Sequence, residues 1–153
     1  MAVQVTPQGT RGGGRLDGPV LKAGMALNVC LYRLLRGAGM KGRMLLLTTV
    51  GARSGAERTT PLAWFPDGDE AWLIVASAGG STRHPAWYTN LARNSGRVWI
   101  EVGDRKLRVR PESLHGPERA ERWQRIVAAS PNFAGYERRT DRELPVIRLT
   151  PAA

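Results

Sequence analysis

Short apolar runs, separated by turn signals, dominate the chain after residue 43. Runs rich in β-branched and aromatic residues predict strands at residues 44–50, 58–65, 71–77, 97–102, 106–112 and 146–149. Gly and Asp residues between them favour tight hairpins, most clearly Gly103 and Asp104. Strands joined in this way suggest an antiparallel β-barrel.

Helical periodicity interrupts the strands. Residues 85–93 and 117–129 predict helices, the second with Pro117 in its first turn and an apolar stripe of Ala120, Trp123, Ile126 and Val127. A shorter segment at 133–142 precedes the last strand. We therefore expect two to three helices packed on the barrel.

Before the first strand, residues 19–36 predict one amphipathic helix, whose apolar stripe comprises Leu27, Leu31, Leu34 and Leu35. Such a stripe most often covers a barrel opening. Contact with anionic lipid through Lys22, Arg33 and Arg36 is the alternative.

The chain of 153 residues is long enough for one core and too short for two ordinary domains. Residues 1–18 are Gly-rich with few large apolar side chains, so we expect a disordered leader. Residues 19–42 form the helix and a Gly-rich link, and residues 43–153 form the barrel. The link matches the dinucleotide-binding glycine pattern, but it follows a helix and precedes a strand, which is the reverse of the required order.

A formal net charge of +10 predicts a surface that attracts anions such as nucleic acid, acidic lipid or a polyanionic small molecule. No recognised nucleic-acid-binding motif accompanies the charge, so we do not expect a nucleic-acid partner. The single Cys30 and the lack of a secretory signal indicate the cytoplasm. His84 and His115 are isolated, so we expect neither a metal site nor a catalytic triad.

The segment 51–62 carries the clearest chemistry. Gly51 and Gly55 bound a turn that holds Arg53 and Ser54, and Arg58 follows on the outgoing strand. Backbone N–H groups, a hydroxyl and two guanidinium groups can together grip phosphate oxygens. A plain hairpin with exposed arginines remains the alternative.

Two further segments suit a flat ligand. Residues 75–80 end a buried strand in small residues, which permits close approach of a ring to the backbone. Residues 85–91 open a helix with aromatic residues and Asn90, which can wall a planar ring and bond its polar groups. Core packing is the competing role for these aromatic residues.

Five blocks occur in register: residues 46–49, 51–62, 76–80, 85–91 and 136–145. Together they resemble the deazaflavin-dependent nitroreductase and quinone reductase family. The resemblance implies an α+β, mainly β, split β-barrel of the FMN-binding type. It also implies binding of coenzyme F420, a 5-deazaflavin with a phosphodiester and polyglutamate tail, and hydride transfer to a quinone, nitroaromatic or other conjugated acceptor.

Carried over residue by residue, the resemblance assigns three sets of positions. The cofactor-binding residues are Arg53, Ser54, Arg58, Thr59, Thr60, Leu62, Val75, Ala76, Ser77, Ala86, Trp87 and Asn90. Ser77 and Tyr136 are the candidate hydrogen-bond and proton donors, and Phe133 and Tyr136 the candidate substrate contacts. Ala52 and Ala78 stand where family members often carry Arg and Lys, and Ser130 and Phe133 stand where the nitroreductase has tyrosines.

Two other interpretations remain open. The same barrel can use FMN in place of coenzyme F420. The protein can also be a module that carries a cofactor or lipid without turnover. The sequence does not identify the oligomeric state or the physiological acceptor.

Overall fold

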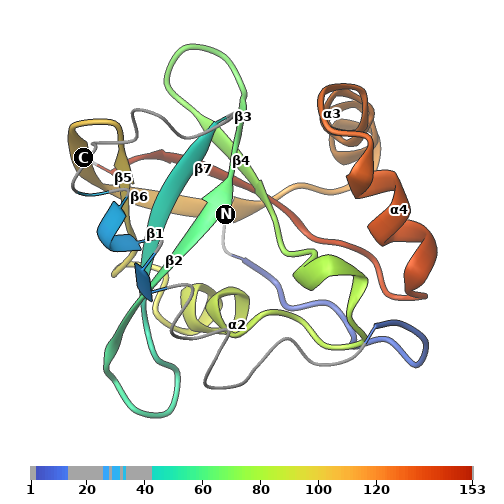
Figure 1. Ribbon diagram of the computed structural model, residues 1–153, viewed down its shortest axis with the longest axis horizontal. Coiled ribbons are helices and arrows are strands. Elements are labelled where there is room, and N and C mark those ends of the chain that lie inside the picture. The colour runs from blue at the N-terminus through green and yellow to red at the C-terminus, as the bar shows by residue number, and fades with distance from the viewer. Residues whose placement is uncertain (1–2, 14–25, 28, 32, 34–42, 153) are drawn as a thin grey trace.

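The computed structural model describes residues 3–13, 26, 27, 29–31, 33 and 43–152 (Figure 1). A sheet of seven strands has the order β2-β1-β5-β6-β7-β4-β3, and its neighbouring strands are antiparallel. The sheet curls into a split β-barrel, which confirms the predicted fold class. The strands are β1 (Met44–Val50), β2 (Glu57–Ala63), β3 (Phe65–Pro66), β4 (Trp72–Val75), β5 (Trp99–Val102), β6 (Arg105–Ser113) and β7 (Val146–Pro151).

Side-chain alternation gives the sheet two apolar faces. One face lines the barrel interior, where Leu45, Leu47, Ile74, Ile100 and Leu149 are fully buried. Helix α2 (Ala86–Arg93) adds Trp87, Tyr88 and Leu91 to the same cluster, so it closes one end of the barrel (Figure 1).

The other face of β4 and β7 packs against two helices, α3 (Gly116–Ala129) and α4 (Asn132–Arg139). Leu73 and Val146 meet Trp123 and Ile126 of α3 and Phe133 of α4 in this outer cluster. Within the predicted stripe of α3, Ala120 is exposed, because the packed face is narrower than the sequence suggested.

The strand predicted at 71–77 ends earlier, at Val75. Ala76 and Ser77 leave the ladder because their carbonyls accept hydrogen bonds from Arg142, and a short 3₁₀ turn, η1 (Ala78–Gly80), follows. This departure forms one wall of the candidate site.

The N-terminal helix packs differently from its predicted stripe. Leu27 and Leu31 are 62% and 43% exposed, whereas Val29 is buried against Leu46 of β1. Arg33 fixes the helix to β5 through a bidentate ion pair with Glu101. The prediction of Leu27 and Leu31 as the packed stripe was therefore wrong, and Leu34, Leu35, Lys22 and Arg36 lie outside the described residues. Within the described residues, no helix is long and apolar enough to cross a bilayer.

Residues 3–13 correct the expectation of a disordered leader. This segment, here called the N-terminal arm, buries Val3 in the inner cluster. It also bonds to the chain beyond η1, through Gly9 N to Thr82 O and Gly13 N to Gly80 O. Its order comes from distant partners, which the local composition does not reveal. Residues 1, 2 and 14–18 lie outside the described residues.

Candidate functional site

The turn between β1 and β2 is built from its own backbone and one hydroxyl. Gly51 N donates to Ala56 O at 2.8 Å and Gly55 N donates to Gly51 O at 2.9 Å. The Ser54 hydroxyl accepts a bond from Ala56 N at 3.2 Å. Gly55 has φ +71°, a conformation that favours glycine. Ser54 thus shapes the turn as well as being exposed beside Arg53.

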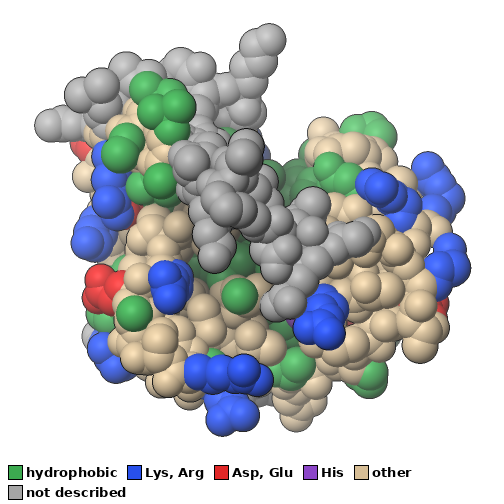
Figure 2. All heavy atoms as spheres, turned by 60° about the horizontal axis from the view of Figure 1, so that its bottom comes forward, with side chains coloured by type: hydrophobic (Ala, Val, Ile, Leu, Met, Phe, Trp, Pro, Cys, Tyr) green, Lys and Arg blue, Asp and Glu red, His purple; other side chains and the backbone are tan. Residues whose placement is uncertain are grey.

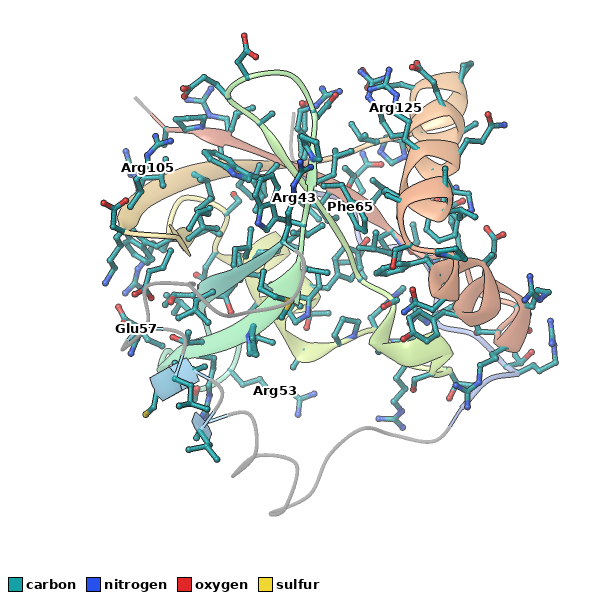
Figure 3. The ribbon with its side chains drawn as sticks, turned by 45° about the horizontal axis from the view of Figure 1, so that its top comes forward. Arg43, Arg53, Glu57, Phe65, Arg105 and Arg125 are labelled. Carbon is teal, nitrogen blue, oxygen red and sulfur yellow. The ribbon has the colours of Figure 1, made fainter. Side chains whose placement is uncertain are left out.

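Arg53 and Arg58 are exposed and have no hydrogen-bond or ion-pair partner among the described residues. Figure 3 shows Arg53 extending from this end of the hairpin, away from the barrel. Other arginines are engaged: Arg122 and Arg148 both pair with Asp67, for example. Two free cations at a Gly-bounded turn fit the doubly ionised phosphate and carboxylate groups of an F420 tail.

Three of the predicted contact residues have partners within the protein. Asn90, on α2, accepts a bond from Ala52 N at 3.0 Å and donates to the Thr49 hydroxyl at 3.5 Å. The Thr59 hydroxyl lies 3.0 Å from that of Thr48. These side chains hold the turn against α2, so their expected effect on the cofactor is through the turn. Thr60 and Leu62 are half-buried on β2.

The second wall lies where β4 ends. Val75 and Ala76 are buried and Ser77 is half-buried. Ala86 is exposed at the start of α2, but Trp87 is only 6% exposed and packs in the inner cluster. The core-packing alternative therefore holds for most of the Trp87 side chain.

Helix α4 brings the predicted substrate residues against η1. A Cβ at Gly80 would lie 2.7 Å from Tyr136 O, so this close approach requires glycine. Phe133 packs edge-to-face on Phe65 and on Tyr136, with ring centroids 5.6 and 5.4 Å apart. The Tyr136 hydroxyl accepts a bond from Asn132 at 3.1 Å. Ser77 and Tyr136 thus belong to contacting segments, while the role of each stays a prediction.

Sequence reasoning gave no role to the residues that support this second wall. Arg142 is 5% exposed and its guanidinium donates to the carbonyls of Ala76, Ser77 and Ser81. His84, 8% exposed, lies beside it, and burial followed by the charge of Arg142 lowers the pKa of this imidazole. The only sequence signal was that Arg142 closes the Thr-Asp-Arg triplet within the last of the five blocks.

Asp141 of the same triplet binds the N-terminal arm. Its carboxylate accepts bonds from the Thr10 hydroxyl and from the backbone N–H groups of Thr10 and Arg11. These bonds, with that from the Thr10 side chain the largest cause, lower the pKa of Asp141 to about 2. The arm is thereby joined to the loop that carries Arg142.

Comparison with known proteins agrees with this architecture. The family model described as F420H(2)-dependent quinone reductase matches residues 26–151. A Mycobacterium tuberculosis F420H(2)-dependent quinone reductase is 44% identical over 109 residues, which cover 69% of this chain and 72% of that protein.

Two solved structures are also similar. One, described as an F420-H2 dependent reductase, has 36% identity and a TM-score of 0.62, and the match covers 72% of this chain and 99% of that one. Another, described as a domain-swapped dimer, has 34% identity and a TM-score of 0.64, covering 81% and 96%. These matches confirm the resemblance drawn from the five sequence blocks: the chain belongs to the family of F420H(2)-dependent quinone reductases.

Proposed function

We propose that this protein transfers a hydride from reduced coenzyme F420 to a quinone. The observation that carries the proposal is the pair of exposed, unpartnered cations, Arg53 and Arg58, at a Gly-bounded turn of a barrel that belongs to this family. The turn supplies cations for a tail of phosphate and carboxylate groups. The small residues at the end of β4 leave room for a flat ring.

Binding is divided between the two walls. Arg53 and Arg58 grip the phosphate-bearing tail, with Ser54 beside them, and the bonds of Asn90 and Thr59 keep the turn in place. Val75, Ala76, Ser77, Ala86 and the edge of Trp87 lie toward the ring. Arginine is suited to this task because its planar guanidinium can bind two oxygens of one phosphate at once.

A bound deazaflavin supplies a hydride and no single electrons, so the chain needs no nucleophile or metal. The Ser77 hydroxyl donates a hydrogen bond to the reducible carbonyl, where negative charge develops during transfer. The Tyr136 hydroxyl, or water, supplies the proton that completes the hydroquinone. The proposal assigns to the protein orientation and proton delivery.

A direct test mixes the protein with reduced F420 and a small quinone and follows the return of the oxidised-coenzyme absorbance. We expect turnover that depends on both reactants. A parallel titration of oxidised F420 and FMN, followed by tryptophan fluorescence, tests the FMN alternative. Tight binding of FMN with no response to F420 would reject the proposed cofactor, and binding of F420 without turnover would favour a carrier.

Two finer assignments accompany this function. Nitroaromatic compounds form a second acceptor class, since they also accept a hydride and a proton. We place the enzyme in the cytoplasm, with peripheral contact to anionic lipid through the exposed Leu27 and Leu31. Co-sedimentation with vesicles containing an anionic lipid should decrease in a Leu27→Ser, Leu31→Ser variant, and equal sedimentation of the two proteins would reject the membrane contact.

A further inference from the structure

A buried cation lies beneath the loop that carries Ser77. The Arg142 guanidinium donates from Nε to Ser81 O at 2.8 Å, from one terminal nitrogen to Ala76 O at 3.0 Å, and from the other to Ser77 O at 2.6 Å. These partners are carbonyls, and no carboxylate pairs with Arg142 among the described residues. A buried charge is costly unless its donors are satisfied, so the fixed fork of arginine and the position of these carbonyls depend on each other.

The loop from Ala76 to Ser81 needs this support. Ala78 has φ +45°, which an alanine adopts only at an energetic cost, and Gly79 and Gly80 also have positive φ. Because the peptide unit is planar, fixing the carbonyls of Ala76 and Ser77 also fixes the direction of the adjoining N–H groups and of the Ser77 side chain. The bonds from Arg142 therefore determine where the Ser77 hydroxyl lies.

His84 completes the arrangement. A guanidinium has only donors, so His84 Nδ1, 3.1 Å from a terminal nitrogen of Arg142, must be the acceptor. His84 Nε2 then carries the proton and donates to Thr6 O at 2.7 Å. The other groups that face the ring are the Tyr88 ring, with its centroid 4.8 Å away, and the Thr6 hydroxyl, and neither is an acidic partner. The imidazole is neutral in this arrangement.

We propose that Arg142 and neutral His84 are positioning residues for hydride transfer, acting through the carbonyls of Ala76, Ser77 and Ser81 to hold the Ser77 hydroxyl against the reducible group of the acceptor. This inference rests on the proposed function. It assigns chemistry to neither residue, because their polar atoms are occupied by the protein itself.

The first test is Arg142→Lys, compared with Val109→Ala. A lysine keeps the charge but cannot reach three carbonyls in one plane. At saturating reduced F420 we expect kcat with a small quinone to fall on the order of tenfold to a hundredfold, as a misplacement of about 1 Å can produce. Backbone hydrogen exchange of residues 76–82 should also become faster.

Val109→Ala opens a cavity in the barrel away from this loop and controls for lost stability. It should lower the melting temperature without changing kcat at a temperature where the variant is folded. Equal kcat in Arg142→Lys and the parent, or an equal loss of kcat in Val109→Ala, would overturn the proposal.

The second test uses two substitutions of His84 and does not depend on Arg142→Lys being folded. His84→Asn places an amide oxygen near the position of Nδ1, so it keeps an acceptor for Arg142 and loses the bond to Thr6. His84→Gln reaches toward Thr6 and removes the acceptor. We expect kcat of His84→Asn to stay within about threefold of the parent, and that of His84→Gln to fall about tenfold or more. The reverse order would show that His84 serves only to bind the arm, and would reject its role.

Protonation of His84 supplies a further readout. Its pKa lies below the ordinary value, and a protonated ring would face Arg142 with two donors, so kcat should fall as the pH falls through that lowered pKa. His84→Asn should lack this acidic limb, and an unchanged limb would reject the assignment. If the parent itself fails to reduce a quinone, the proposed function fails. Hydrogen exchange at residues 76–82, measured without cofactor, then still tests whether Arg142 and His84 hold the loop.

Discussion

The β1–β2 turn and the loop from Ala76 to Ser81 stand at the two ends of α2, and they are held in different ways. The turn closes on itself through bonds between residues 51 and 56, and leaves its two arginines free. The loop is held by Arg142, more than sixty residues later in the chain, and by the N-terminal arm. Figure 2 shows lysine and arginine side chains spread over the surface, so free charge alone does not mark the turn.

The difference separates binding from positioning. A locally closed turn tolerates changes elsewhere in the protein, so it suits the part of a ligand that needs charge and little geometry. The loop depends on contacts across the whole fold, so its geometry is more exact and more easily lost. Helix α2 joins the two, through Asn90 to the turn and through His84, just before the helix, to Arg142.

Removal of residues 1–13 should have the largest effect, and on the loop alone. It exposes the site of Val3, worth about 1.5 to 3 kcal/mol, and leaves His84 and the Tyr88 hydroxyl without partners, at about 1 kcal/mol each. Denaturant unfolding should show a loss of about 3 to 5 kcal/mol. Val5→Ala, at an exposed position of the arm, should change stability by less than about 0.5 kcal/mol. An unchanged midpoint after truncation would mean that the arm contributes nothing.

Arg53→Ala and Arg58→Ala should act on the turn alone. Each removes a charge-assisted contact of about 1.5 to 3 kcal/mol, so the Kd for oxidised F420 should rise about tenfold to a hundredfold. The affinity of the parent should fall with salt. Arg110→Ala, which removes an exposed arginine of β6, is the control for net charge. Equal affinity in all three variants would show that the turn does not bind the tail.

Phe133→Tyr sharpens the substrate side of the loop. It restores the hydroxyl that the nitroreductase carries, so turnover of a bulky nitroimidazole should rise about tenfold, a modest part of what a positioned proton donor can contribute. Quinone turnover and the Kd for F420 should remain within about twofold. Phe65→Tyr adds a hydroxyl to the same aromatic cluster and should not raise nitroimidazole turnover. A similar gain in both variants would deny Phe133 a specific role.

Ala78→Gly should have the smallest effect and the opposite sign to most substitutions. Relief of the left-handed strain gains about 1 to 2 kcal/mol, and the added freedom of glycine in the unfolded chain costs about 0.5 to 1 kcal/mol. Denaturant unfolding should show a net gain of about 0.5 kcal/mol. Ala120→Gly, at an exposed helical position, should instead lose about 0.5 to 1 kcal/mol. A loss in both variants would indicate that Ala78 is not strained.

The sequence by itself determined the strands, the three helices after them and the phosphate-binding candidates. Strand and helix periodicity depends on neighbours within a few residues, and so does a turn such as 51–56. The five blocks in register identified the family, because they preserve the order of several local features at once.

Only the tertiary structure decided the order of the N-terminal arm, the face on which Val29 packs and the roles of Arg142 and His84. Each depends on a partner far away in the chain: Val3 on the barrel interior, Val29 on Leu46, and Arg142 on Ala76 and Ser77. A buried cation and an exposed one have the same letter in a sequence. What distinguishes Arg142 from Arg53 is the set of acceptors that the fold brings to it, and that set exists only when the sheet has closed.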